Sequence, residues 1–162
     1  MAVEIGASDV EPVVRSVVVG IDPEAAFELF TVGMGTWWPL HTHSIAADTF
    51  EGRVTVTELV FEAHPGGSIY EVMSDGTKGE WGKVLEWEPP GRVVFSWKPN
   101  LEDVPPTEVE VTFIAVDDGT DVRLEHRGWE RLGERGAVLR RGYEQGWPTM
   151  LSRFAQRTQR DA

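Results

Sequence analysis

The sequence predicts an α+β fold in which a curved antiparallel sheet of six or seven strands wraps around one long C-terminal helix. From residue 13 to residue 127, segments that alternate apolar and polar residues are separated by short turns, and short turns join antiparallel neighbours. After Gly128 and Trp129 the apolar spacing becomes that of a helix. The apolar face of the sheet needs a cover, and only this last helix is long enough to provide it.

The first strand is expected at residues 13–19, which are rich in β-branched valine and end at Gly20. Asp22 is a good N-cap and Pro23 suits the first helical position, so we expect a short helix to begin there. Residues 36–44 are aromatic and show no period, which indicates a short helical turn followed by a loop. One or two short helices should therefore follow the first strand.

Six further strands should follow, each ending at a turn rich in glycine, proline or aspartate. We expect them at residues 53–61, 68–73, 78–87, 92–98, 107–116 and 120–127. Apolar residues at helical spacing then form one face of the last element: Leu139, Tyr143, Trp147, Leu151 and Phe154. Pro148 lies inside this pattern and removes one backbone hydrogen bond, so we expect a kink or a break near it.

Length and composition exclude several classes of protein. A chain of 162 residues fits a single domain, 1–162, in which we expect residues 1–10 to form a flexible N-terminus. The absence of cysteine excludes disulfides, thiolate metal sites and a cysteine nucleophile. A net charge of −12 argues against nucleic acid as a partner, because a polyanion requires a cationic surface. No signal peptide and no membrane span are recognisable, so we expect a cytoplasmic protein.

Several segments resemble a known family. Residues 23–30 are similar to the entry helix of the START-like (SRPBCC) superfamily. Four later segments resemble the branch named for the activator of Hsp90 ATPase (AHSA1): Gly66-Gly67, residues 81–84 followed by Pro89-Pro90, residues 119–129, and residues 143–147 followed by Leu151. The resemblance implies the helix-grip fold and a cavity for a small apolar or amphipathic ligand. It does not specify a reaction, because one fold hosts many functions.

Candidate ligand-binding residues come from the elements that should face the space between sheet and helix. His126 shares strand parity with Val122 and Leu124, so its ring should point inward. The tryptophans could stack a flat ligand, and the tyrosine hydroxyls could bind its polar groups. The full set is Trp37, Trp38, His41, Tyr70, Trp81, Trp97, His126, Tyr143, Trp147 and Met150.

Each of these residues also has a purely structural interpretation. The aromatic residues could simply fill the core, and His126 could be a buried neutral imidazole bonded to the backbone. His41 and His43 are two residues apart, but a zinc site needs a third protein ligand, so we expect neither a metal nor a cofactor. Either Glu58 or Glu71 could turn inward as a buried carboxylate and serve as a general base.

Three functions remain open on the sequence. The favoured one is binding of a small hydrophobic or amphipathic molecule in the cavity between the sheet and the C-terminal helix. The second is a cyclase, hydratase or hydrolase that uses the same cavity. The third is an interaction protein, in which the acidic sheet or the arginine-rich helix contacts a partner such as a chaperone. The identity of the ligand and the oligomeric state, including a homodimer, are left undecided.

Overall fold

The computed structural model describes residues 10–50 and 53–159. Among these residues, seven strands form one antiparallel sheet in the order β1-β7-β6-β5-β4-β3-β2. The strands are β1 (Val13–Val19), β2 (Val56–Phe61), β3 (Ser68–Met73), β4 (Lys78–Glu88), β5 (Arg92–Trp97), β6 (Thr107–Val116) and β7 (Gly119–Arg127). The predicted fold class is confirmed. Of the predicted flexible N-terminus, residues 1–9 lie outside the described residues.

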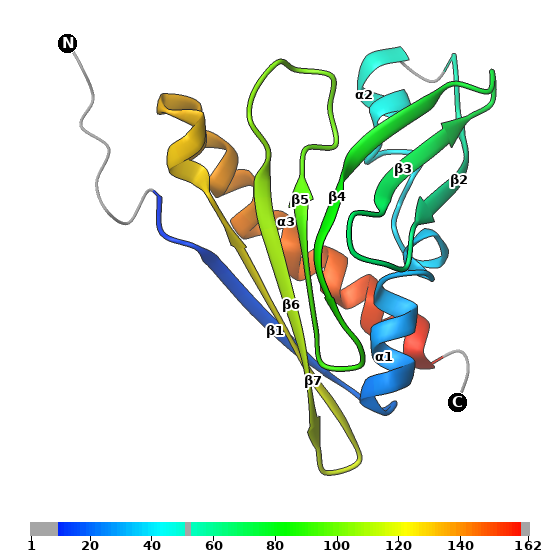
Figure 1. Ribbon diagram of the computed structural model, residues 1–162, viewed down its shortest axis with the longest axis vertical. Coiled ribbons are helices and arrows are strands. Elements are labelled where there is room, and N and C mark those ends of the chain that lie inside the picture. Colours follow the sequence, from blue (N-terminus) through cyan, green and yellow to red (C-terminus); the bar gives the residue numbers. More distant parts are fainter. Residues whose placement is uncertain (1–9, 51–52, 160–162) are drawn as a thin grey trace.

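The helices are α1 (Pro23–Phe30), the 3-10 helix η2 (Met34–Thr36), α2 (Ile45–Phe50), the 3-10 helix η3 (Trp129–Leu132) and α3 (Glu134–Gln159). Helix α1 begins as predicted, because the Asp22 side chain accepts a 2.8 Å hydrogen bond from the Ala25 N–H and Pro23 takes the first turn. Figure 1 shows α3 crossing one face of the curved sheet, with α1 beside its C-terminal end. No helix among the described residues is both long and apolar enough to cross a membrane.

The ladders on one side of the sheet contain irregularities. Register shifts occur between β2 and β3, between β3 and β4, and between β4 and β5. Such bulges bend a strand and increase its twist. Gly82 of β4 lies against β5 so closely that a Cβ there would be 1.8 Å from the Ser96 carbonyl oxygen. Both features are typical of a bent, strongly twisted sheet.

Helix α3 continues through Pro148 without a break. Proline has no N–H, so the carbonyl of Glu144, four residues earlier, loses its helical partner. The Arg15 guanidinium on β1 donates a 3.3 Å hydrogen bond to this carbonyl, and it also lies 3.6 Å from the Glu144 carboxylate. Of the predicted kink or break, the break does not occur, because a side chain from a neighbouring strand replaces the missing donor.

One local prediction differs from the structure. The second strand begins at Val56, three residues later than predicted, and a register shift separates Val56 from Glu58. The short helices expected after the first strand are confirmed, and one of them, α2, lies at residues 45–50, to which the sequence assigned no element. This six-residue helix is too short to be stable by itself. Contacts with β3, described below, explain why it forms.

Candidate functional site

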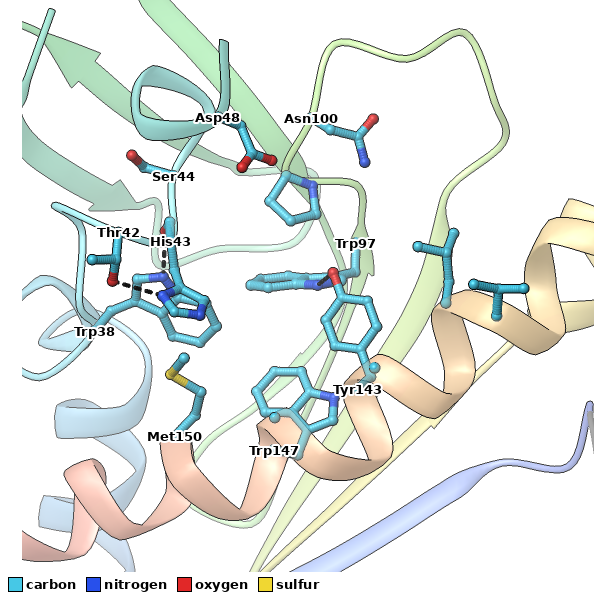
Figure 2. Close-up of a pocket in the computed structure, with 15 residues that line it drawn as sticks. Trp38, Thr42, His43, Ser44, Asp48, Trp97, Asn100, Tyr143, Trp147 and Met150 are labelled. Atoms are coloured by element: carbon cyan, nitrogen blue, oxygen red, sulfur yellow. Dashed lines mark hydrogen bonds between the residues drawn. The ribbon is translucent and has the colours of Figure 1, made fainter. Parts of the chain in front are cut away.

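A pocket of about 440 Å³ opens between α3, the segment that leads into α2, and the loop after β5. Figure 2 shows side chains from all three segments turned toward this space. Its lining consists of Trp38, Thr42, His43, Ser44, Asp48, Trp97, Pro99, Asn100, Val138, Leu139, Gly142, Tyr143, Gly146, Trp147 and Met150. The rim reaches solvent, since the Val138 side chain is 67% exposed. The volume falls within the usual range for small-molecule sites.

The inner wall of the pocket is aromatic. The ring centroid of Trp38 lies 5.5 Å from that of Trp97 and 6.0 Å from that of Trp147, and Trp97 and Trp147 are 5.8 Å apart. These separations are typical of favourable aromatic pairs. The Trp38 indole N–H donates a 2.8 Å hydrogen bond to the His43 carbonyl, which fixes this ring at the wall. Met150 of α3 completes the apolar surface.

A buried hydrogen-bonded chain behind this wall holds two of the tryptophans. The Trp147 indole donates to Nδ1 of His126 at 2.9 Å, and Nε2 of His126 lies 2.7 Å from the Thr107 hydroxyl oxygen. An indole N–H can only donate, so Nδ1 is the acceptor and Nε2 carries the proton. The Thr107 hydroxyl in turn donates to the Trp97 carbonyl at 3.1 Å.

His126 is fully buried, and this desolvation lowers its pKa to about 3. Its ring points inward, as predicted, yet it does not line the pocket. Tyr143 and Trp147 contact it from the pocket side, with ring centroids 4.7 and 5.9 Å away. Both ring nitrogens are engaged within the protein, so His126 acts here as a neutral positioning residue for Trp147.

Tyr143 brings a hydroxyl group into the pocket. The Trp97 indole N–H donates to this oxygen at 3.0 Å, and no described residue accepts the hydroxyl proton. Burial raises the pKa of Tyr143 to about 12, and the negative charge of Asp48 acts in the same direction. The hydroxyl therefore stays protonated at neutral pH and is free to donate a hydrogen bond to a ligand.

Asp48 belongs to α2, and Figure 2 shows its carboxylate turned toward the pocket. Its helix is held in place by Glu71 of β3, which is fully buried. The Glu71 carboxylate accepts hydrogen bonds from the N–H groups of Ile45 at 2.7 Å and Ala46 at 3.0 Å, and from the Trp81 indole at 2.7 Å. The inward carboxylate expected at Glu58 or Glu71 is thus Glu71, while Glu58 is exposed. The hydrogen bonds that Glu71 accepts from Ile45 and Ala46 anchor the N-terminus of α2 to β3.

Two glycines on α3 keep the pocket open. Gly142 and Gly146 are four residues apart and both line it, and a Cβ built at either position meets no atom within 4 Å. Glycine inside a helix costs about 0.5–1 kcal/mol relative to alanine. Larger side chains at these positions would project into the pocket.

The predicted candidate residues separate into those at the pocket and those away from it. Trp38, Trp97, Tyr143, Trp147 and Met150 line it. The five residues away from its lining are Trp37, His41, Tyr70, Trp81 and His126.

Trp37 packs in the core, 5.2 Å from the Phe30 ring, and Trp81 is bound to Glu71. His41 is exposed on its loop, and in the described part of the chain no three potential metal ligands come together. Tyr70 alternates with the buried residues of β3 and faces away from the core, with the Lys78 ammonium 5.2 Å from its ring.

Sequence reasoning missed Asp48, Asn100 and the two helix glycines. Asp48 was assigned to no element, and no local pattern separates it from an ordinary surface carboxylate. Gly142 and Gly146 carried a signal, because glycine repeated every four residues on an apolar helix face needs an explanation.

Comparisons with solved structures place this architecture among known proteins. CalC from Micromonospora echinospora, a self-sacrificing resistance protein, is 27% identical, with 95% of this chain and 97% of that chain covered and a TM-score of 0.70. The anthrahydroquino-γ-pyrone synthase Txn09 is 32% identical, with coverages of 91% and 96% and a TM-score of 0.60. Aha1 from Colwellia psychrerythraea, solved as a dimer, is 17% identical, with coverages of 89% and 92% and a TM-score of 0.60, which shows the fold alone.

No curated protein matches the sequence. The sequence model of one family, described as activator of Hsp90 ATPase homolog 1-like protein, matches residues 21–159, which include every element from α1 to α3. The chain therefore belongs to the family of activator of Hsp90 ATPase homolog 1-like proteins.

Proposed function

We propose that the protein binds a small, flat, amphipathic molecule in the pocket between α3, α2 and the loop after β5. The observation that carries the proposal is the pocket itself, about 440 Å³ in volume, with three indole rings on its wall and a Tyr143 hydroxyl that accepts from Trp97 and has no described acceptor for its own proton. Proteins of this fold typically bind hydrophobic ligands, which supports the same conclusion.

The aromatic wall supplies most of the expected affinity. A ligand that buries about 200 Å² of apolar surface against it would gain roughly 5 kcal/mol at about 25 cal/mol per Å². A hydrogen bond from Tyr143 to an acceptor on the ligand adds about 1 kcal/mol and fixes its orientation. These two gains sum to about 6 kcal/mol before the cost of association, so we expect simple aromatic probes to bind weakly, with dissociation constants no tighter than about 40 μM.

Filling the pocket from the helix tests this proposal. Gly146→Leu introduces a side chain into the pocket where a Cβ meets no atom, and leucine favours the helix more than glycine does. Gln145→Leu is the matched control, because Gln145 is exposed on the same helix and does not line the pocket. A panel of flat aromatic compounds is titrated while tryptophan fluorescence is followed.

We expect the Gly146→Leu protein to bind the best compounds at least about tenfold more weakly than the wild type, and the Gln145→Leu protein to bind them unchanged. Equal binding by all three proteins would contradict the proposed site. A panel in which no compound binds the wild type would contradict the proposed function.

Catalysis in the same pocket is a second candidate, favoured by the 32% identity to the synthase Txn09. The protein and Txn09 are incubated in parallel with the Txn09 substrate, and products are identified by mass spectrometry. Formation of the same product would support catalysis in this pocket, and recovery of unchanged substrate would argue against the Txn09 reaction. The Tyr143 hydroxyl would serve as a hydrogen-bond donor, because its raised pKa prevents it from acting as a base at neutral pH.

Three other expectations stay predictions. A contact with a chaperone is supported only by the family description and by the similarity of the fold to that of Aha1. A homodimer is compatible with the Aha1 dimer, and size-exclusion chromatography with light scattering would test it. A cytoplasmic location is also only expected, and the absence of cysteine is consistent with it.

A further inference from the structure

We propose that the pocket selects organic cations: its ligand is a flat aromatic molecule that carries a protonated amine, held by the Asp48 carboxylate and by the faces of the surrounding indoles. The inference rests on the proposed function and adds the charge of the ligand to it. Three features of the pocket support it, namely its charge, its rings and its hydrogen-bonding groups.

The lining carries no permanent positive charge among the described residues, and its one titratable base is His43. Among the described residues that line the pocket there is no lysine or arginine, and Asp48 is the one carboxylate. This carboxylate forms no hydrogen bond or ion pair with the part of the chain that the structure describes. By contrast, Glu110 on the sheet is bonded to both Arg92 and Arg127. An anionic ligand would meet an unneutralised negative charge at Asp48, whereas a cation would be attracted by it.

The indole rings on the pocket wall also favour a positively charged ligand. Trp38, Trp97 and Trp147 pack against one another, with centroids 5.5 to 6.0 Å apart, and form one wall of the space toward which Asp48 is turned (Figure 2). The face of an indole carries negative electrostatic potential and attracts ammonium groups, more strongly than the other aromatic side chains do. A carboxylate beside several indoles is thus an arrangement suited to a protonated amine.

The hydrogen-bonding groups define where the ligand's polar atoms lie. The Tyr143 oxygen already accepts a bond from Trp97, so toward a ligand its hydroxyl donates. Asp48 only accepts when ionised. The Asp48 charge reaches Tyr143, since it contributes to the raised pKa of that phenol. The expected ligand therefore presents a hydrogen-bond acceptor to Tyr143 and a cationic N–H donor to Asp48.

The experiment compares three tricyclic probes of similar shape at pH 8: 9-aminoacridine, which is a cation, acridine, which is neutral, and acridine-9-carboxylate, which is an anion. Binding to the full chain is measured by equilibrium dialysis in 150 mM NaCl. Asp48 is exposed, so its ion pair with a cation lies at the mouth of the pocket and is partly screened by water. We expect 9-aminoacridine to bind about tenfold more tightly than acridine, which combines a cation–π contribution with this exposed ion pair. The anion should bind most weakly.

Asp48→Asn tests the origin of this preference, because asparagine keeps the shape of the side chain and removes its charge. Asp117→Asn is the control. Asp117 is exposed in the turn between β6 and β7, at the opposite end of the sheet from the pocket, and its replacement changes the net charge equally (Figure 1). We expect the tenfold advantage of the cation to fall to about twofold in Asp48→Asn and to remain in Asp117→Asn.

Equal binding of the cation and the neutral probe, or an equal effect of both substitutions, would overturn the inference and leave the proposed function standing. If none of the three probes binds the wild type, both the inference and the proposed function fail.

Discussion

Replacing His126 with glutamine should remove a specific part of the pH dependence of folding stability. The His126 ring is neutral in the folded protein, with a pKa of about 3, whereas an imidazole in the unfolded chain has a pKa of about 6.5. Between these two values the unfolded chain binds a proton that the folded protein does not bind. The stabilisation is complete above pH 6.5 and is lost as the pH falls toward 3.

The expected size of this effect follows from the two pKa values. Protonation of the unfolded state lowers the free energy of unfolding by about 2 kcal/mol when the pH falls from 7 to 5. The total loss approaches about 5 kcal/mol below pH 3. Glutamine can still accept a bond from Trp147 and donate one to Thr107, but it does not titrate.

Urea unfolding of the wild type, His126→Gln and His64→Gln at pH 7, 6 and 5 measures this contribution directly. Carboxylates also titrate in this range, so the comparison uses the difference between proteins. His64 is exposed, so its replacement should preserve the wild-type pH dependence. The His126→Gln protein should lose about 2 kcal/mol less than the wild type between pH 7 and 5. If the two proteins lose stability in parallel, to within 0.5 kcal/mol, the assignment of a neutral buried imidazole is refuted.

Three further substitutions test other parts of the structure. Arg15→Met should destabilise the protein by about 1 kcal/mol in urea unfolding, because the Glu144 carbonyl loses the donor that replaces its helical partner; an unchanged midpoint would contradict this role. Glu71→Gln should cost about 2–3 kcal/mol and weaken probe binding, since the amide cannot accept from all three of its N–H donors and α2 loosens; wild-type stability together with wild-type binding would contradict the anchor. Tyr143→Phe should cost about 1–2 kcal/mol because the Trp97 indole N–H loses its acceptor, and calorimetry should show weaker binding of probes that carry a hydrogen-bond acceptor but not of probes without one.

Patterns along the chain were enough to predict the sheet and the main helix. The alternation of residues in β7 correctly predicted that His126 points inward, because successive side chains of a strand point to opposite faces of the sheet. The helical spacing that unites Tyr143 and Trp147 likewise placed them toward the sheet, and both reach the pocket. These residues could be identified because one element alone determines the direction of each side chain.

The rest of the site depends on contacts between distant segments. Asp48 reaches the pocket only because Glu71, 23 residues away, holds the N-terminus of α2. The sequence left both a kink and a break open at Pro148, because nothing in the local sequence indicates that Arg15 bonds to the carbonyl left free. Trp37 and Trp38 are adjacent, yet one lies in the core and the other at the pocket, a division set by the turn of the backbone between them.

The most direct test of the account is a crystal structure of the protein with 9-aminoacridine. The account predicts the acridine rings against Trp38, Trp97 and Trp147, with one N–H of the cation, on the ring nitrogen or on the amino group, donating to the Asp48 carboxylate. Density for the probe at any other place on the protein, or a probe in the pocket with neither N–H directed toward Asp48, would contradict the account.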